Sequence, residues 1–173
     1  MVLMRNRTMK IVVAVSAFAV ALAGPAAAAE TGETAPQSAL SEGSGTVEVI
    51  ATPAPGAPGA QAVIRCVGGT DNPHKSHTDP RRANVHVNIT CSANVARIAV
   101  RGAIYRDGAL AGTSARNHVT TGRKSAANHA NTACRNNHLY GSWVGGEITF
   151  PPNYVPPTGK ISAFGRSARI TNC

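Results

Sequence analysis

The fold is decided by the stretch Asn84-Val-His-Val-Asn-Ile-Thr-Cys-Ser-Ala-Asn-Val-Ala-Arg-Ile-Ala-Val-Arg-Gly-Ala-Ile-Tyr-Arg-Asp-Gly108. Over Val85–Cys91 every second residue is apolar, which is the period of a strand with one buried face. A second apolar run, Ile98–Tyr105, leads into Asp107-Gly108 and a further apolar run. An Asp-Gly pair between two such runs predicts a β-hairpin, because the turn needs positive φ angles that these residues tolerate.

Similar patterns on both sides of this stretch predict an all-β protein. The expected strands are Gln61–Cys66, Val85–Cys91, Arg97–Tyr105, Ala109–Thr121, Ala126–Cys134, Leu139–Phe150 and Lys160–Cys173, with a polar loop between Val67 and Ala83 and a turn at Gly122. Seven to eight short strands separated by turns are typical of an antiparallel β-sandwich. Its inner faces are expected to hold Val85, Val87, Ile89, Ile98, Val100, Ile104, Ile148, Phe150, Ile161 and Phe164.

The N-terminal part of the chain differs from this pattern. Residues 1–29 combine a basic start, a short apolar run and an alanine-rich exit, which is the order of a secretory signal peptide. Residues 30–60 are acidic and rich in Pro and Gly, and we expect a flexible, disordered arm before a β-sandwich domain at 61–173. No later apolar run is long enough to span a membrane. The protein is therefore expected to be secreted and extracellular.

The four cysteines are interpreted as two disulfides. An even number of cysteines in an exported chain predicts a disulfide framework, and none has the Cys-x2-Cys spacing of a zinc site. Four cysteines allow three pairings. We favour Cys66–Cys91 with Cys134–Cys173, since each bridge would join strand ends and the second would hold the C-terminal residue in place.

A short apolar patch lies within the predicted arm. It consists of Val47, Glu48, Val49 and Ile50 and has the composition of a strand. It could be donated to a partner protein or form an edge strand of its own domain. Intramolecular pairing is favoured because it costs less entropy.

Charge is distributed unevenly along the chain. Residues 30–60 contain four Glu and no Lys or Arg, whereas residues 61–173 contain 14 of the 17 Lys and Arg and four acidic residues. A cationic secreted body favours acidic partners, such as an acidic protein, a cell-wall polyanion or nucleic acid. A role in solubility alone explains the same composition.

One loop carries a possible metal site. Asp71, His74, His77 and Asp79 supply imidazole and carboxylate groups, which suit zinc or a similar ion. Lys75 lies between the two histidines and Arg81-Arg82 follow them, which opposes a cation. The sequence therefore favours a solvated loop and no cofactor.

The remaining histidines raise the possibility of a small basic ribonuclease. These histidines are His86, His118, His129 and His138. Two imidazoles and a cation can cleave RNA by general acid–base catalysis. Nothing in the sequence marks which pair would act, so surface positions are the favoured interpretation.

A glycan-binding surface is another possibility. Tyr140, Trp143 and Tyr154 could form an aromatic platform for sugars, although core packing explains Trp143 equally well. So few aromatic residues argue against nucleic-acid binding by base stacking. Neither a Gly-x-Ser-x-Gly elbow nor a carboxylate pair supports a hydrolase.

Several motifs resemble a group of small secreted bacterial β proteins with two disulfides. They are the run Ile104–Gly112, a cysteine ahead of Tyr140, the Pro-rich segment Phe150–Pro157 and the terminal Cys173. The arrangement is similar to that of the adaptor subunit of umbrella toxin particles. That resemblance implies a non-enzymatic connector whose N-terminal strap and compact body link a toxin scaffold to a lectin.

These observations together predict a secreted, non-catalytic protein-binding module without a catalytic constellation. Its expected partner is a secreted protein, either acidic or part of a toxin complex, and Val47–Ile50 is expected to face that partner. The alternatives are a cationic ribonuclease and a glycan-binding protein.

Overall fold

The computed structural model describes residues 45–56 and 62–173, and these residues form ten β-strands and no helix. The predicted signal peptide, residues 30–44 and 57–60 of the predicted arm, and Gln61 at the start of the first expected strand lie outside the described residues. The strands are β1 (Thr46–Pro53), β2 (Ile64–Thr70), β3 (His74–Lys75), β4 (Arg82–Arg106), β5 (Ala109–Thr113), β6 (His118–Ala133), β7 (His138–Thr149), β8 (Tyr154–Val155), β9 (Thr158–Phe164) and β10 (Ala168–Ile170). All of their pairings are antiparallel.

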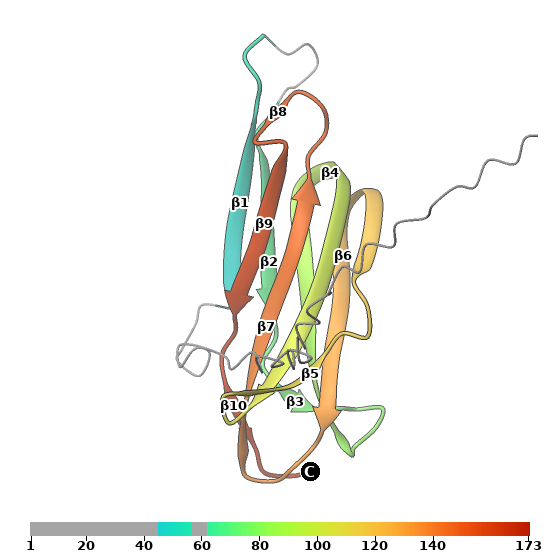
Figure 1. Cartoon of the computed structure of the whole chain (residues 1–173), viewed down its shortest axis with the longest axis vertical. Coiled ribbons are helices and arrows are strands. Elements are labelled where there is room, and N and C mark those ends of the chain that lie inside the picture. The colour runs from blue at the N-terminus through green and yellow to red at the C-terminus, as the bar shows by residue number, and fades with distance from the viewer. Residues whose placement is uncertain (1–44, 57–61) are drawn as a thin grey trace, which may run out of the picture. The chain divides into compact units, whose positions relative to one another are not determined.

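The long strand β4 passes through both layers of a sandwich. Its first half pairs with β2 and its second half with β7, and the pairing with β6 shifts register between Thr90 and Val95. Figure 1 shows the β4–β6 ribbon turning over at one end of the molecule. Val87 lies in the first half of β4 and Gly102 in the second half. A Cβ on Gly102 would lie 2.9 Å from the Val87 side chain, so the two halves of β4 face each other across the core. The two strands expected at Val85–Cys91 and Arg97–Tyr105 are therefore parts of one continuous strand.

Each layer is built around one half of β4. The first layer contains β8, β1, β2, the first half of β4 and the second half of β6, with β3 at the start of β4. The second layer contains β9, β7, the second half of β4, the first half of β6 and β5, with β10 at the start of β7. The predicted all-β antiparallel sandwich is confirmed.

The core lies between the two layers, where the alternation of each strand places its apolar residues. Nine of the ten predicted inner residues are buried. Phe164 is the exception, because β9 sends Ile161 inward and Phe164 to the outer face, where its ring lies 5.7 Å from that of Tyr105. The prediction that Phe164 belongs to the core is therefore wrong.

Several strand boundaries differ from the expectation. The expected last strand, Lys160–Cys173, is two strands, β9 and β10, and β6 includes most of the expected strand Ala126–Cys134. The expected strand Ala109–Thr121 is two strands, β5 and β6, separated by residues 114–117. β6 continues through Gly122, where a turn was predicted, with a φ of 61° at that glycine. β2 extends into the predicted loop as far as Thr70. Gly68 on β2 leaves room for the side chain of Ile161 on β9, because a Cβ on this glycine would lie 2.3 Å from Ile161 Cγ2.

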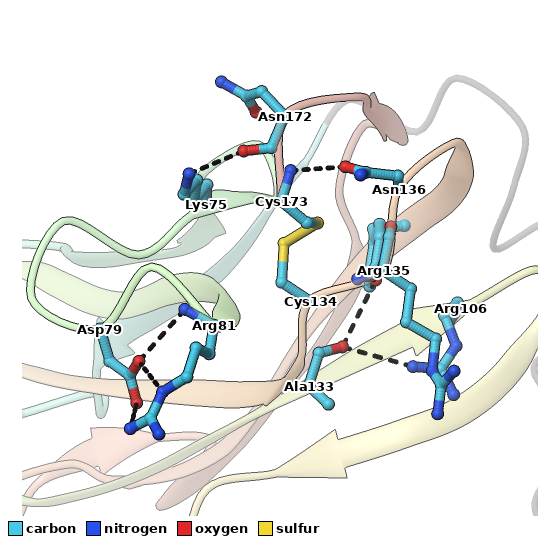
Figure 2. Close-up of a disulfide and its surroundings, with 11 residues drawn as sticks. Lys75, Asp79, Arg81, Arg106, Ala133, Cys134, Arg135, Asn136, Asn172 and Cys173 are labelled. Carbon is cyan, nitrogen blue, oxygen red and sulfur yellow. Dashed lines mark hydrogen bonds and ion pairs between the residues drawn. A yellow bond between two sulfur atoms is a disulfide. The ribbon is translucent and has the colours of Figure 1, made fainter.

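The predicted hairpin and disulfides are present. Asp107 and Gly108 have φ angles of 51° and 85° and connect β4 to β5. Cys66 and Cys91 are buried register partners on β2 and β4 and form one bridge. The other bridge joins Cys134, directly after β6, to Cys173 (Figure 2). The favoured pairing is thus confirmed.

The patch Val47–Ile50 lies inside strand β1. β1 pairs with β2 from Thr46 to Ala51 and with β8 at Thr52 and Pro53. The predicted arm therefore contains a strand of the sandwich, which pairs with the first strand after residue 60 in the sequence. This is the intramolecular pairing that the entropy argument favoured.

Candidate functional site

The outer face of β4, β7 and β9 carries the most distinctive surface of the described residues. Alternation sends Arg97 and Arg101 outward on β4, while Ile98 and Val100 enter the core. We call this surface the Trp143 face. Its outward residues on the three strands are Arg97, Ala99, Arg101, Ala103, Tyr105, Trp143, Gly145, Glu147, Lys160, Ser162 and Phe164.

The indole of Trp143 lies across the neighbouring glycine. A Cβ on Gly145 would lie 2.0 Å from Trp143 Cη2, so only glycine at this position lets the ring lie over the strand. Trp143 Nε1–H donates a hydrogen bond to Ser162 Oγ at 3.1 Å. The guanidinium carbon of Arg101 lies 5.3 Å from the ring centroid, within the range of a cation–π contact. Contacts from two neighbouring strands therefore fix the ring.

A shallow groove of about 350 Å³ runs beside this indole. Ala99, Gly145 and Gly146 line it and carry small side chains or none, which leaves room for the groove. Arg97, Arg101 and Lys160 line it together with Glu147. Three cations against one carboxylate give the groove a positive potential, which attracts negatively charged groups.

Most acidic side chains of the described residues lie elsewhere and have partners. Glu48 pairs with Arg65 at 3.4 Å. Hydrogen bonds from Arg81 hold the pKa of the Asp79 carboxyl below its usual value. His138 and the backbone N–H of Leu139 lower the pKa of Asp107 in the same way. These acids are therefore engaged away from the Trp143 face, whose positive charge they do not neutralise.

The structure does not assemble the predicted aromatic platform. Tyr140 is fully buried, and its hydroxyl accepts a hydrogen bond from the backbone N–H of Arg135 at 2.8 Å. Tyr154 lies on β8 and donates to the carbonyl of Ala62 at 3.1 Å. Trp143 therefore lies on its face without either tyrosine, and the three residues do not form the platform that was considered as an alternative.

The loop that was considered from its sequence as a possible metal site is split in two. Asp71 and His74 lie together, with His74 Nδ1 3.7 Å from Asp71 Oδ2, but Asp79 faces Arg81 instead. The third group at Asp71 is His86, whose Nδ1 lies 2.8 Å from Asp71 Oδ2. Sequence reasoning missed His86 as a partner because it lies in the following long strand, and only the β2–β4 register brings it close.

The other histidines are dispersed. His129 is the register partner of His86 on β6, and both line a hollow of about 360 Å³ with Arg82. His118 lies near the other end of β6, opposite Val100, and His138 pairs with Asp107. The His86–His129 pair is the only cross-strand histidine pair of the described strands, and no sequence spacing marks it.

Comparisons of the chain with protein-family models, with curated proteins and with solved structures found no match. Among the described residues, no helix is long and apolar enough to cross a membrane. Two disulfides fit an oxidising compartment.

Proposed function

We propose that this protein is a secreted, non-catalytic binding module that holds an acidic protein partner on the Trp143 face. The observation that carries the proposal is the indole of Trp143, which lies over Gly145 and beside Arg101 at the edge of a cationic groove. A fixed aromatic ring next to an arginine is the combination most often found at the energetic centre of protein interfaces.

Charge supports an acidic partner. Arg97, Arg101 and Lys160 line the groove, and the described residues give none of them an ion pair with a carboxylate. A partner segment rich in Asp or Glu would supply the missing negative charge. Such charge complementarity speeds association and makes binding sensitive to salt.

The apolar surroundings favour a protein over a glycan or nucleic acid. A smaller hollow lies on the other side of Trp143, lined by Tyr105 and by Leu110, which is 40% exposed. A peptide can place an apolar side chain here and carboxylates in the groove. Single-stranded nucleic acid needs several exposed stacking rings, whereas on this face Trp143 and Phe164 are half-buried and Tyr105 is buried.

A connector role needs a second attachment surface, and β1 offers one. Over Val47–Ala51 its pairing within the described residues is with β2 alone, so its outer edge can accept another strand. Ile50 is 40% exposed on this strand. With the resemblance to adaptor subunits of toxin particles, this suggests that Val47–Ile50 and the Trp143 face contact different members of a secreted complex.

Calorimetric titration with a defined probe tests the proposal. The probe is a short peptide rich in Asp and Glu that carries one leucine, and its control is the same peptide with Asn and Gln. We expect saturable binding of the acidic peptide that weakens as salt rises, and at least tenfold weaker binding to the Arg101→Ala variant. Arg116→Ala is the matched control, because this exposed arginine lies outside the groove.

Three outcomes would contradict the proposal. The first is equal affinity for the acidic and amide peptides, and the second is equal loss in both arginine variants. The third is binding of an acidic oligosaccharide but not of the peptide, which would assign the face to a glycan. Cleavage of RNA by the pure protein between pH 5 and 8, lost in a histidine variant, would contradict its non-catalytic character.

A further inference from the structure

A carboxylate and two imidazoles meet on the outer face of the other layer. Asp71 follows β2, His74 begins β3 and His86 points outward from β4. One ligand atom from each lies within 4.8 Å of the others. We propose that these three side chains bind a divalent transition-metal ion, with Zn²⁺ the ion that fits them best. This proposal is independent of the Trp143 face.

The distances match the size of a zinc site. Zinc binds imidazole nitrogen and carboxylate oxygen at about 2.0–2.2 Å, so two ligand atoms of a tetrahedral ion are about 3.4 Å apart. Asp71 Oδ2 lies 2.8 Å from His86 Nδ1 and 3.7 Å from His74 Nδ1, which brackets that value. His74 Nδ1 also lies 3.0 Å from the backbone carbonyl of Asn72, and binding through this nitrogen gives up that hydrogen bond. Small side-chain movements then suffice to enclose the ion.

Backbone contacts hold the carboxylate in place. Asp71 Oδ1 accepts a hydrogen bond from the backbone N–H of His86 at 2.7 Å, and the backbone N–H of Asp71 donates to the carbonyl of His86 at 3.0 Å. The second carboxylate oxygen is thereby directed at the imidazoles. The rings of His74 and His86 are stacked, with centroids 5.3 Å apart and planes 24° from parallel.

The chemistry of His86 allows the exchange of a proton for a metal ion. Its Nδ1 contacts Asp71, and its Nε2 lies 3.2 Å from the amide nitrogen of Asn84. When a metal ion takes the Nδ1 lone pair, the ring proton resides on Nε2 and needs an acceptor. Asn84 Oδ1 is buried and has no hydrogen-bond partner within the described part of the chain. Rotation of this amide would present that oxygen to Nε2.

The cations that argued against a metal site in the sequence are directed elsewhere. Lys75 Nζ donates to the carbonyl of Asn172 at 2.7 Å, and Arg81 is held by Asp79 (Figure 2). Arg82 Nε lies 4.0 Å from Asp79 Oδ2, and Arg82 also lines the hollow beside His86. The three ligand residues are partly open to solvent, so an ion can enter. A fourth position remains for water or for His77, whose ring lies 5.8 Å from that of His74.

Competition with a zinc-sensitive chelating dye tests the site on the full secreted protein, purified without a polyhistidine tag. We expect one Zn²⁺ per chain, and neither Mg²⁺ nor Ca²⁺ should compete, because these ions prefer oxygen ligands. His74→Ala and His86→Ala should each weaken binding at least tenfold. His118→Ala is the matched control, because this histidine is exposed on β6 and lies outside the cluster. Thermal unfolding without metal shows whether each variant folds.

A second readout locates the ion. In the wild type, Zn²⁺ should shift the ring ¹⁵N resonances of His74 and His86 and raise the melting temperature, and Asp71→Asn should reduce that rise. The proposal is overturned if no saturable binding occurs at micromolar Zn²⁺. It is equally overturned if folded His74→Ala and His86→Ala variants bind Zn²⁺ as tightly as His118→Ala does.

Discussion

Replacing Gly145 with alanine tests directly whether the position of the Trp143 indole matters for binding. The added Cβ would lie 2.0 Å from Trp143 Cη2, whereas two carbon atoms in contact are about 3.5–4.0 Å apart. The obstacle is the far end of a side chain, so the ring can swing away while the backbone keeps its place. The variant should therefore fold and lose the ring position.

The expected loss of stability is small, because the contacts that Trp143 loses are partly offset by the gain from replacing glycine with alanine. The displaced ring loses its hydrogen bond to Ser162, about 0.5–1.5 kcal/mol, and its contact with Arg101, about 0.5–1 kcal/mol. Replacing glycine by alanine returns about 0.4–1 kcal/mol by restricting the unfolded chain. We expect a net loss of about 1 kcal/mol in unfolding free energy. Binding of the acidic peptide should weaken by at least tenfold, because a buried aromatic anchor contributes about 2 kcal/mol or more.

Urea unfolding and calorimetry measure the two effects, and the near-ultraviolet circular dichroism of the single tryptophan reports whether the ring has moved. Gly69→Ala is the matched control, since a Cβ on this strand glycine meets its neighbours at an ordinary 3.5 Å. If the Gly145→Ala spectrum changes and peptide affinity does not, Trp143 is no part of the interface. If the spectrum is unchanged, the described position of the ring is wrong.

Three further predictions concern the fold. Replacing Cys134 and Cys173 together by alanine removes a cross-link spanning 39 residues, and chain entropy predicts a loss of up to about 4 kcal/mol in urea unfolding; a loss below about 1 kcal/mol would contradict a structural role for the bridge. The pKa of Asp107 is lowered by the hydrogen bond from His138, so its stabilising effect is complete above the ordinary carboxyl value of about 3.9 and is lost as pH falls below it. The fall in urea midpoint between pH 5 and pH 2 should therefore be smaller in Asp107→Asn, and an equal fall in both proteins would refute that contribution. Gly68→Ala should lower the melting temperature by the equivalent of about 1–3 kcal/mol, because a Cβ there would lie 2.3 Å from a buried isoleucine, whereas a strand glycine with free space would tolerate the change.

The architecture was largely predictable because it follows from local patterns. Period-two alternation identified the strands around Val85–Cys91, and Asp107-Gly108 identified the hairpin, since both signals depend on neighbouring residues. The alternation is interrupted at residues 92–94, which are all exposed, so the sequence predicted two separate strands here. The local pattern could not show that one strand crosses from one layer to the other, which depends on how the β4–β6 ribbon folds over.

The Trp143 face was partly predictable, and one signal was overlooked. Tyr140 and Trp143 are three residues apart in one strand, so their side chains point to opposite faces. That parity excludes a shared platform, and it also places Gly145 beside Trp143. The contact with Arg101 required the β4–β7 register, in which Arg101 pairs with Gly145.

The cluster of Asp71, His74 and His86 could not be predicted from the sequence, because its members come from three separate strands or loops. Asp71 and His86 are separated by β3 and a turn, and their contact arises because β2 and β4 are paired up to Thr70 and Val87. The directions of Lys75 and Arg81 were equally hidden, since both are set by partners elsewhere in the fold. Counting charges along the loop therefore could not show where these two side chains are directed.

The most direct test of the proposed function is a fluorescence titration of the wild-type protein with the acidic peptide. Trp143 is the single tryptophan of the chain, so its emission reports on this face alone. We predict a saturable change in emission that is absent with the amide peptide and shifts to higher peptide concentration as salt rises. Peptide binding that calorimetry detects while the emission stays constant would place the partner elsewhere and contradict the account.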